Sequence, residues 1–252
     1  MINLKTSDWQ IDNIKTVLFD KDGTIIDLHY FWGKMTEMRA NKVIKKYKIP
    51  QENFSKICLF LGYDLNTKKM LPNGITAIYS RSKIIEIFRE KLEEFGIISS
   101  TEEIENIFDS VSAKFYKNMS EYTKSIKEAI DFIKELHQAG VKLGIVTSDS
   151  IESTKLTLKN FGWEKYFDVV IGRESSEFTK ESGEPTKLAL KTLNATPKTT
   201  IMIGDTPMDY ISAKNAGVNI TILVATGQIK KEELETTSPF VVNSLSEIKI
   251  YS

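Results

Sequence analysis

Two aspartates that lie close together are the clearest candidates for catalytic residues. Asp20 and Asp22 lie two positions apart, directly after the apolar run of residues 15–19. Gly23 follows and permits a tight turn. Such a pair suits covalent phosphoryl transfer, in which one carboxylate attacks to form an acyl phosphate and the other protonates the leaving oxygen and later activates water. A surface Asp-Gly turn is the alternative, but the apolar run in front favours the chemical interpretation.

A second carboxylate pair follows another apolar run. Asp205 follows Gly204 at the end of the apolar run of residues 200–203, and Asp209 lies one helical turn further along the chain. Carboxylate oxygens are the ligands that Mg²⁺ prefers. Aspartate is also a common residue at the start of a helix. The residues alone therefore leave open whether Asp205 binds a metal or caps the next helix.

Hydroxyl groups and a lysine complete the set of candidates. Thr147 and Ser148 follow the apolar run of residues 142–146 and could hold a phosphoryl oxygen, or could cap a helix. The negative charge of a phosphoryl group also needs a cationic partner. Lys180 and Lys187 are the candidates in the following stretch, although most lysines are solvated surface residues.

These polar residues lie within a regular alternation of strand-like and helix-like segments. Strand-like runs cover residues 15–19, 142–146, 168–171, 200–203, 220–224 and 240–242. Helix-like segments cover residues 126–139, 151–160 and 184–193. This order predicts an α/β fold with a mostly parallel sheet and helices on both faces. Ligands bind beyond the carboxyl ends of such strands, which is where Asp20, Thr147 and Asp205 lie.

The middle of the chain has a different character. Apolar residues recur there at helical spacing, as in Ile84, Ile85 and Phe88, and no convincing strand is visible. We therefore expect a helical domain of residues 29–119, inserted into a core domain formed by residues 1–28 and 120–252.

Composition narrows the classes of protein. Hydrophobic residues make up 41% and charged residues 27% of the 252 residues, which is typical of a globular protein. The formal net charge is zero, which argues against a nucleic-acid-binding protein. Cys58 is the single cysteine, so no intramolecular disulfide can form, and a reducing cytoplasm is expected. The polar N-terminus lacks a signal-peptide core, and no apolar run reaches the roughly 18 residues of a membrane span.

The order of these motifs resembles the haloacid-dehalogenase-like superfamily from Val17 to about Ile248. Asp27, the run of residues 213–217 and the ending of residues 240–245 fit its phosphoglycolate-phosphatase-like branch. The resemblance implies a Rossmann-like, doubly wound parallel sheet with an inserted α-helical cap domain.

The resemblance also implies a role for each candidate. Asp20 would be the nucleophile, and Asp22 would be the general acid and base. The implied catalytic residues are Asp20, Asp22, Thr147 and Lys180; the phosphate-binding residues are Gly23, Thr24 and Ser148; and the ligands of a Mg²⁺ cofactor are Asp20, Asp22, Asp205 and Asp209. Asp209 would support the metal shell or orient the lysine.

The lysine motif departs from the family pattern. The family has Lys-Pro-x-Pro, whereas this chain has Lys180 followed by Glu181, and Pro185 only later. Lys180 has the family-like separation from Asp205 and is favoured, with Lys187 as the alternative.

The expected function is a magnesium-dependent phosphatase acting on a small soluble phosphomonoester, such as phosphoglycolate or a sugar or nucleotide phosphate. A phosphomutase or phosphotransferase on the same scaffold is one alternative, and a catalytically silent binding protein is another. Asp22 argues against dehalogenation, because the dehalogenases of the superfamily lack this second aspartate. The expected state is a cytoplasmic monomer or homodimer with no membrane and no nucleic-acid partner.

Overall fold

A parallel sheet forms the centre of the α/β unit in the computed structural model, which describes residues 1–251. Its six strands have the order β10-β9-β8-β3-β6-β7. Their bounds are β3 (Thr16–Phe19), β6 (Lys142–Val146), β7 (Val169–Ile171), β8 (Thr200–Gly204), β9 (Ile220–Val224) and β10 (Val241–Val242). All neighbouring pairs are parallel. The predicted α/β class is therefore confirmed.

Helices cover both faces of this sheet. Adjacent residues of β3 show this, because their side chains point to opposite faces and pack against different helices. Leu18 packs in an apolar cluster with Leu190 and Ala213, whereas the ring of Phe19 contacts that of Phe132. The helices of this unit are α7 (Lys127–Gln138), α8 (Ile151–Phe161), α9 (Glu184–Thr192), α10 (Pro207–Asn215) and α11 (Lys231–Leu234). This arrangement is the predicted doubly wound fold.

The chain reverses direction across the sheet at β3. From β3 it runs to β6 and β7 on one side, and then crosses to β8, β9 and β10 on the other. The carboxyl ends of β3, β6 and β8 thus lie side by side, as their registers show. Ligand sites form at such a switch point.

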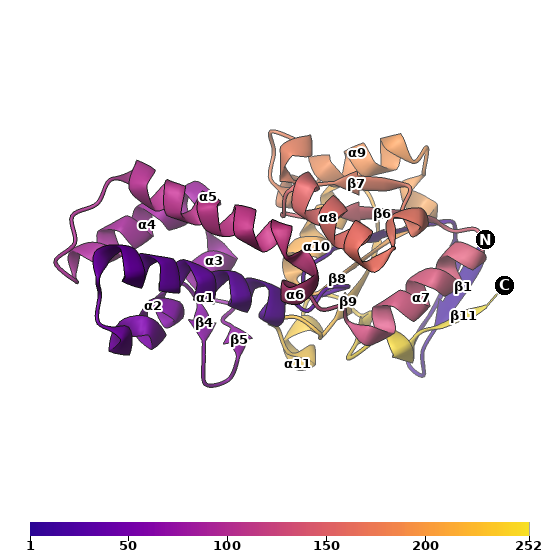
Figure 1. Ribbon diagram of the computed structural model, residues 1–252. Helices are drawn as coiled ribbons and strands as arrows, with labels where there is room; N and C mark the ends of the chain where they lie inside the picture. The colour runs from indigo at the N-terminus through magenta and orange to yellow at the C-terminus, as the bar shows by residue number, and fades with distance from the viewer. Residues whose placement is uncertain (252) are drawn as a thin grey trace. The chain divides into compact units, whose positions relative to one another are not determined.

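A second, smaller sheet was not predicted. It is antiparallel, with the order β11-β1-β2, and its strands are β1 (Ile2–Lys5), β2 (Gln10–Ile14) and β11 (Lys249–Tyr251). The two ends of the described chain therefore lie beside each other (Figure 1). These strands are short and carry many polar residues, so the apolar pattern did not reveal them.

The chain divides into two compact units. One comprises Met1–Asp27 and the chain from Lys124 onward, and the other comprises Leu28–Thr123. The second unit is called the helical insertion below. Its limits differ by a few residues from the expected 29 and 119, because Leu28 already begins a helix and the last short helix packs within the insertion.

The helical insertion has its own apolar core. Its helices are α1 (Leu28–Tyr47), α2 (Phe54–Phe60), α3 (Ile75–Ile78), α4 (Arg81–Glu93), α5 (Thr101–Lys117) and α6 (Met119–Tyr122). Val43, Phe88 and Phe108 are fully buried and join α1, α4 and α5. Within the described part of the chain, no helix combines the length and the apolar composition that a membrane span requires.

The insertion also contains a small hairpin that the sequence did not indicate. Its strands are β4 (Tyr63–Asp64) and β5 (Lys69–Met70), which pair antiparallel. The expectation that this region contains no strand was therefore wrong. Strands of two residues are too short to show the alternating pattern by which a strand is predicted.

Candidate active site

Asp20 meets a lysine from a distant part of the chain. Asp20 follows the last residue of β3, and its backbone N–H donates to the carbonyl of Ile203 in β8 at 2.8 Å. The Nζ of Lys180 lies 2.5 Å from the Oδ1 of Asp20, and both side chains are almost completely buried. A charged hydrogen bond of this kind fixes the carboxylate in place.

A backbone turn delivers Lys180 to this position. Residues Lys180–Ser182 form a short 3-10 turn, and the Asn215 side-chain amide at the end of α10 donates to the carbonyl of Glu181 at 2.7 Å. Gly183 then adopts a left-handed conformation with a φ of +81° and packs closely against Asn215. Lys187 lies elsewhere, because it pairs with Glu184 at the protein surface. Of the two lysine candidates, only Lys180 reaches Asp20.

Asp209 holds the other side of Lys180. Its Oδ1 lies 2.5 Å from the Lys180 Nζ. Its Oδ2 accepts from the backbone N–H and the hydroxyl of Thr206, at 3.1 and 3.0 Å, and so caps α10. A side chain at Gly204 would overlap the Asp209 carboxylate. Both oxygens of Asp209 are thus engaged by protein groups, which favours orientation of the lysine over direct metal binding.

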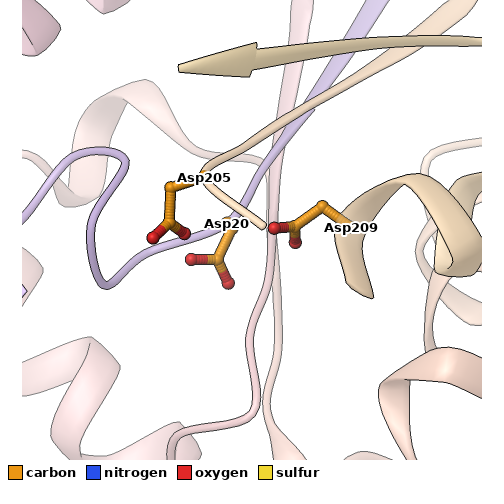
Figure 2. Close-up of side chains that lie close together, drawn as sticks. All are labelled: Asp20, Asp205 and Asp209. Atoms are coloured by element: carbon orange, nitrogen blue, oxygen red, sulfur yellow. The ribbon is translucent and has the colours of Figure 1, made fainter. Parts of the chain in front are cut away.

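Asp205 completes a cluster of buried carboxylates. It follows the last residue of β8 and is 3% exposed. Gly23 and Gly227 both pack so closely on its carboxylate that a side chain at either position would overlap it. One oxygen from each of Asp20, Asp205 and Asp209 lies within 4.8 Å of the others, and Figure 2 shows the three side chains gathered around one small volume.

Burial changes the acidity of this cluster. Burial, together with the neighbouring carboxylates of Asp209 and Asp22, raises the pKa of Asp20 from an ordinary 3.8 to about 7, although Lys180 opposes the change. Burial and the carboxylates of Asp20 and Asp209 likewise raise the pKa of Asp205 well above its usual value. One lysine therefore does not compensate the negative charge that these carboxylates would carry when ionised.

The donor set fits a magnesium ion. The cluster offers only carboxylate oxygens, which are hard ligands of the type that Mg²⁺ prefers. A bound cation would also relieve the repulsion that raises the pKa values of Asp20 and Asp205. Because Asp209 is already engaged, Asp20 and Asp205 are the side chains best placed to hold the ion.

Asp22 has a lysine partner that the sequence analysis did not single out. The Nζ of Lys21 lies 2.6 Å from the Oδ1 of Asp22 and 3.0 Å from the Oδ2 of Asp149. Lys21 is completely buried. Burial by itself would lower the pKa of Lys21, but the Asp149 and Asp22 carboxylates outweigh it and raise that pKa. No sequence signal marks such a lysine, because lysines are usually solvated.

The four hydroxyl and glycine candidates lie on the same edge of the sheet. Thr147 follows β6, is buried, and accepts from the backbone N–H of Asp149 at 3.1 Å. Ser148 is exposed. Thr24 is buried, and within the described residues its hydroxyl finds no hydrogen-bond partner. Gly23 forms a left-handed turn, and its carbonyl accepts from the hydroxyl of Thr226 at 2.5 Å.

Comparison with known families gives this site its context. A model of the haloacid dehalogenase-like hydrolase family matches residues 14–217. The chain therefore belongs to the haloacid dehalogenase-like hydrolases, and the resemblance read from its motifs is confirmed. It is a hydrolase of this family, and phosphatases are among its named relatives.

Individual relatives cover nearly the whole chain. The pyrophosphatase PpaX of Bacillus anthracis is 27% identical, covering 93% of this chain and 94% of that protein. The pyrophosphatase PpaX of Halalkalibacterium halodurans is also 27% identical, covering 83% of each chain.

Solved structures share the fold at lower identity. A predicted phosphoglycolate phosphatase from Haemophilus somnus 129PT has a TM-score of 0.69 at 15% identity, covering 93% of this chain and 96% of that one. A hydrolase of the superfamily, subfamily IA, from Geobacter sulfurreducens PCA has a TM-score of 0.64 at 18% identity, covering 95% and 96%.

Proposed function

We propose that this protein is a magnesium-dependent phosphatase that forms a phosphoryl-aspartate on Asp20. The observation that carries the proposal is the buried bridge of Lys180 between Asp20 and Asp209, with the carboxylate of Asp205 in the same cluster. A carboxylate that is fixed by a lysine and lies in a cluster of carboxylates suited to a metal ion is well placed for in-line attack on phosphorus.

Asp20 attacks the phosphorus atom, and the bond to the leaving oxygen breaks. Lys180 keeps the Asp20 side chain in one orientation and supplies positive charge next to the phosphoryl oxygens. Asp209 keeps Lys180 in place from the opposite side. The result is an acyl phosphate on Asp20, which water must then hydrolyse.

Asp22 moves the protons in both halves of the reaction. It donates a proton to the leaving oxygen in the first step, and it accepts a proton from the attacking water in the second. Its side chain is 14% exposed, so it can reach a substrate at the edge of the sheet. The hydroxyls of Thr147, Thr24 and Ser148, with the turn at Gly23, are proposed to bind the phosphoryl group.

Magnesium, held by Asp20, Asp205 and the backbone carbonyl of Asp22, would neutralise the charge of the phosphoryl oxygens and of the carboxylates. Asp209 is proposed to orient Lys180 rather than to bind the ion directly.

The proposed substrate is a small phosphomonoester, such as phosphoglycolate or a sugar or nucleotide phosphate. Inorganic pyrophosphate is a second candidate, because two relatives that align over most of this chain are named as pyrophosphatases. Both reactions transfer a terminal phosphoryl group, so the same residues would serve either substrate.

The test is phosphate release from a panel that includes phosphoglycolate, sugar phosphates, nucleotide monophosphates and pyrophosphate, with Mg²⁺ and with EDTA. We expect release that requires Mg²⁺ and is strongest for one substrate. Quenched reactions of the wild type should contain an acid-stable, hydroxylamine-sensitive phosphoryl group on the protein, and Asp20→Asn should lack it.

Turnover that survives in folded, highly purified Asp20→Asn protein would overturn the phosphoryl-aspartate mechanism. Transfer of phosphate to a second hydroxyl instead of water would identify a phosphotransferase or mutase. Folded, magnesium-loaded protein that releases no phosphate from any substrate would favour a binding protein.

A further inference from the structure

A completely buried lysine lies between the two aspartates of the catalytic turn. The Lys21 side chain has no solvent exposure, and its Nζ contacts Asp22 at 2.6 Å and Asp149 at 3.0 Å. The mechanism proposed above gives Lys21 no chemical step. Because burying a charge is costly unless it is paired, this lysine calls for a physical explanation.

Asp149 anchors the lysine from a separate loop. Asp149 lies between β6 and α8 and is 6% exposed. Its Oδ1 accepts from the backbone N–H of Ser150 at 2.7 Å, and its backbone carbonyl accepts from the backbone N–H of Arg173 at 3.0 Å. The Asp149 carboxylate is therefore fixed by the backbone, and it fixes Lys21 in turn.

Asp22 is the more exposed of the two partners of Lys21. Its side chain is 14% exposed, whereas that of Asp149 is 4% exposed and that of Lys21 is 0% exposed. The hydrogen bond from the buried Lys21 to this partly exposed aspartate is charge-assisted, so it restrains the orientation of the Asp22 carboxylate. The chain of contacts runs from the rigid backbone at Asp149, through Lys21, to the Asp22 carboxylate.

The same arrangement occurs around the nucleophile. Lys180 bridges Asp20 to Asp209 at the start of α10, just as Lys21 bridges Asp22 to Asp149 just before α8. Each aspartate of the catalytic turn thus has its own buried lysine, and each lysine is anchored by an aspartate from a distant segment of the chain: Asp209 in the first turn of α10, and Asp149 in the loop before α8.

We propose that Lys21 is a positioning residue that holds the Asp22 carboxylate in the orientation needed for proton transfer, with Asp149 as its anchor. This inference rests on the proposed function. Lys21 transfers no proton. The proton passes from Asp22 to the leaving oxygen as the phosphorus–oxygen bond breaks, and a proton returns to Asp22 from the water that hydrolyses the acyl phosphate.

The structural alternative is that Lys21 only neutralises Asp149. Two substrates separate the alternatives. An alkyl phosphate, such as glycerol phosphate, has a basic leaving oxygen that must be protonated. A nitrophenyl phosphate has a stable leaving group that needs little protonation. A misplaced Asp22 should therefore slow hydrolysis of the alkyl substrate much more than hydrolysis of the aryl substrate.

The experiment measures kcat/KM for both substrates in wild type and in Lys21→Met, which keeps a long, uncharged side chain. Small errors in the position of a catalytic group lower rates by up to about 10²-fold. We expect the aryl-to-alkyl ratio of kcat/KM to rise by about 10- to 100-fold in Lys21→Met. This corresponds to loss of part of the rate acceleration that general acid catalysis supplies.

Two double variants serve as controls. Lys21→Met with Asp149→Asn removes the unpaired buried charge, so we expect its melting temperature to exceed that of Lys21→Met while the raised aryl-to-alkyl ratio persists. In Asp22→Asn, which shows the full loss of proton transfer, adding Lys21→Met should change the ratio by less than about twofold.

The outcomes are distinct. If wild type hydrolyses neither substrate nor any of the panel, the proposed function fails and this inference fails with it. If wild type is active and Lys21→Met lowers kcat/KM equally for both substrates, the inference alone is wrong. It is also wrong if the Lys21→Met and Asp149→Asn double variant recovers the wild-type ratio, because neutralisation of Asp149 would then be the whole role of Lys21.

Discussion

Lysines and aspartates are buried together in the α/β unit, whereas they lie at the surface in the helical insertion. The buried charged residues of the α/β unit are Asp20, Lys21, Asp149, Lys180, Asp205 and Asp209. In the described insertion, Arg39 is the one charged residue that is buried. The ion pairs of the insertion join partly or fully exposed residues, as in the pairs Lys83–Glu86 in α4 and Lys91–Glu94 at the end of α4.

This difference indicates that the buried charged residues mark the candidate active site, because stability does not explain their burial. Exposed ion pairs contribute little to stability, because water and salt screen them. Buried ion pairs carry a large desolvation penalty and seldom improve stability over apolar packing. The α/β unit nevertheless buries two lysines and four aspartates at one edge of its sheet, which is expected of a site that must preorganise charge.

The largest expected effect comes from Lys180, with Lys187 as the matched control. Lys180→Met should lower kcat by about 10²- to 10³-fold, the usual effect of removing one donor to a developing negative charge. Lys187→Met removes a surface lysine seven positions away and should change kcat by less than about twofold. Steady-state kinetics on the best substrate measures both. Equal losses in the two variants would contradict the assignment of Lys180.

The next effect concerns the metal. Asp205→Asn should raise the Mg²⁺ concentration for half-maximal activity by at least about 10-fold, because a charged ligand is replaced by a neutral one. Asp109→Asn, in the helical insertion, removes a surface partner of Arg81 and should leave this concentration unchanged. Magnesium titrations of the initial rate make the comparison. An unchanged magnesium requirement in Asp205→Asn would exclude Asp205 as a ligand.

A smaller effect should appear in the pH dependence of stability. Because the folded, metal-free protein holds the pKa of Asp20 near 7 rather than 3.8, it binds more protons than the unfolded chain between these values. Its free energy of unfolding should therefore fall as the pH rises through this window. If Mg²⁺ binds Asp20 as proposed, it competes with this proton, so its stabilising effect should be larger at pH 8 than at pH 5.5.

Thermal unfolding at both pH values, with Mg²⁺ and with EDTA, measures this effect. Asp20→Asn removes the titrating carboxyl group, so its metal-free melting temperature should depend less steeply on pH over this window. A wild-type protein that is equally stabilised by Mg²⁺ at the two pH values would contradict the prediction.

The smallest effect is expected in the helical insertion. Glu94→Gln removes the partner of Lys91 on α4 and keeps the shape of the side chain. Because both groups are solvent-accessible, the free energy of unfolding should fall by less than about 0.5 kcal/mol. Urea denaturation measures it. A loss of several kcal/mol would show that a surface ion pair of the insertion contributes strongly to stability. The contrast drawn above between exposed and buried charges in the two units would then be wrong.

The sequence predicted the large sheet because its strands are buried on both faces. Such strands are continuous apolar runs, as in β3 and β8, where every residue is buried. β2 has two buried and three exposed residues without strict alternation, and its neighbour β1 pairs with β11 from the opposite end of the chain. Pairing of that kind depends on tertiary structure and leaves no local pattern.

Candidate residues of the site were visible where they end a strand. Asp20, Thr147 and Asp205 follow β3, β6 and β8, so topology brings them to one edge of the sheet. Lys21 and Asp149 were missed, because each is an ordinary surface-type residue until the fold buries the two together. A single sequence cannot distinguish such a pair from solvated charges.

The division of the chain into two units also has a consequence for the order of biosynthesis. The helical insertion is one continuous stretch, Leu28–Thr123. Strand β3, in contrast, has neighbours β6 and β8 that are translated only after the insertion has been made. Since domains generally fold as units, the N-terminal ones first during synthesis, the insertion can acquire its structure while β3, with Asp20 just after it, still lacks the strands that pair with it.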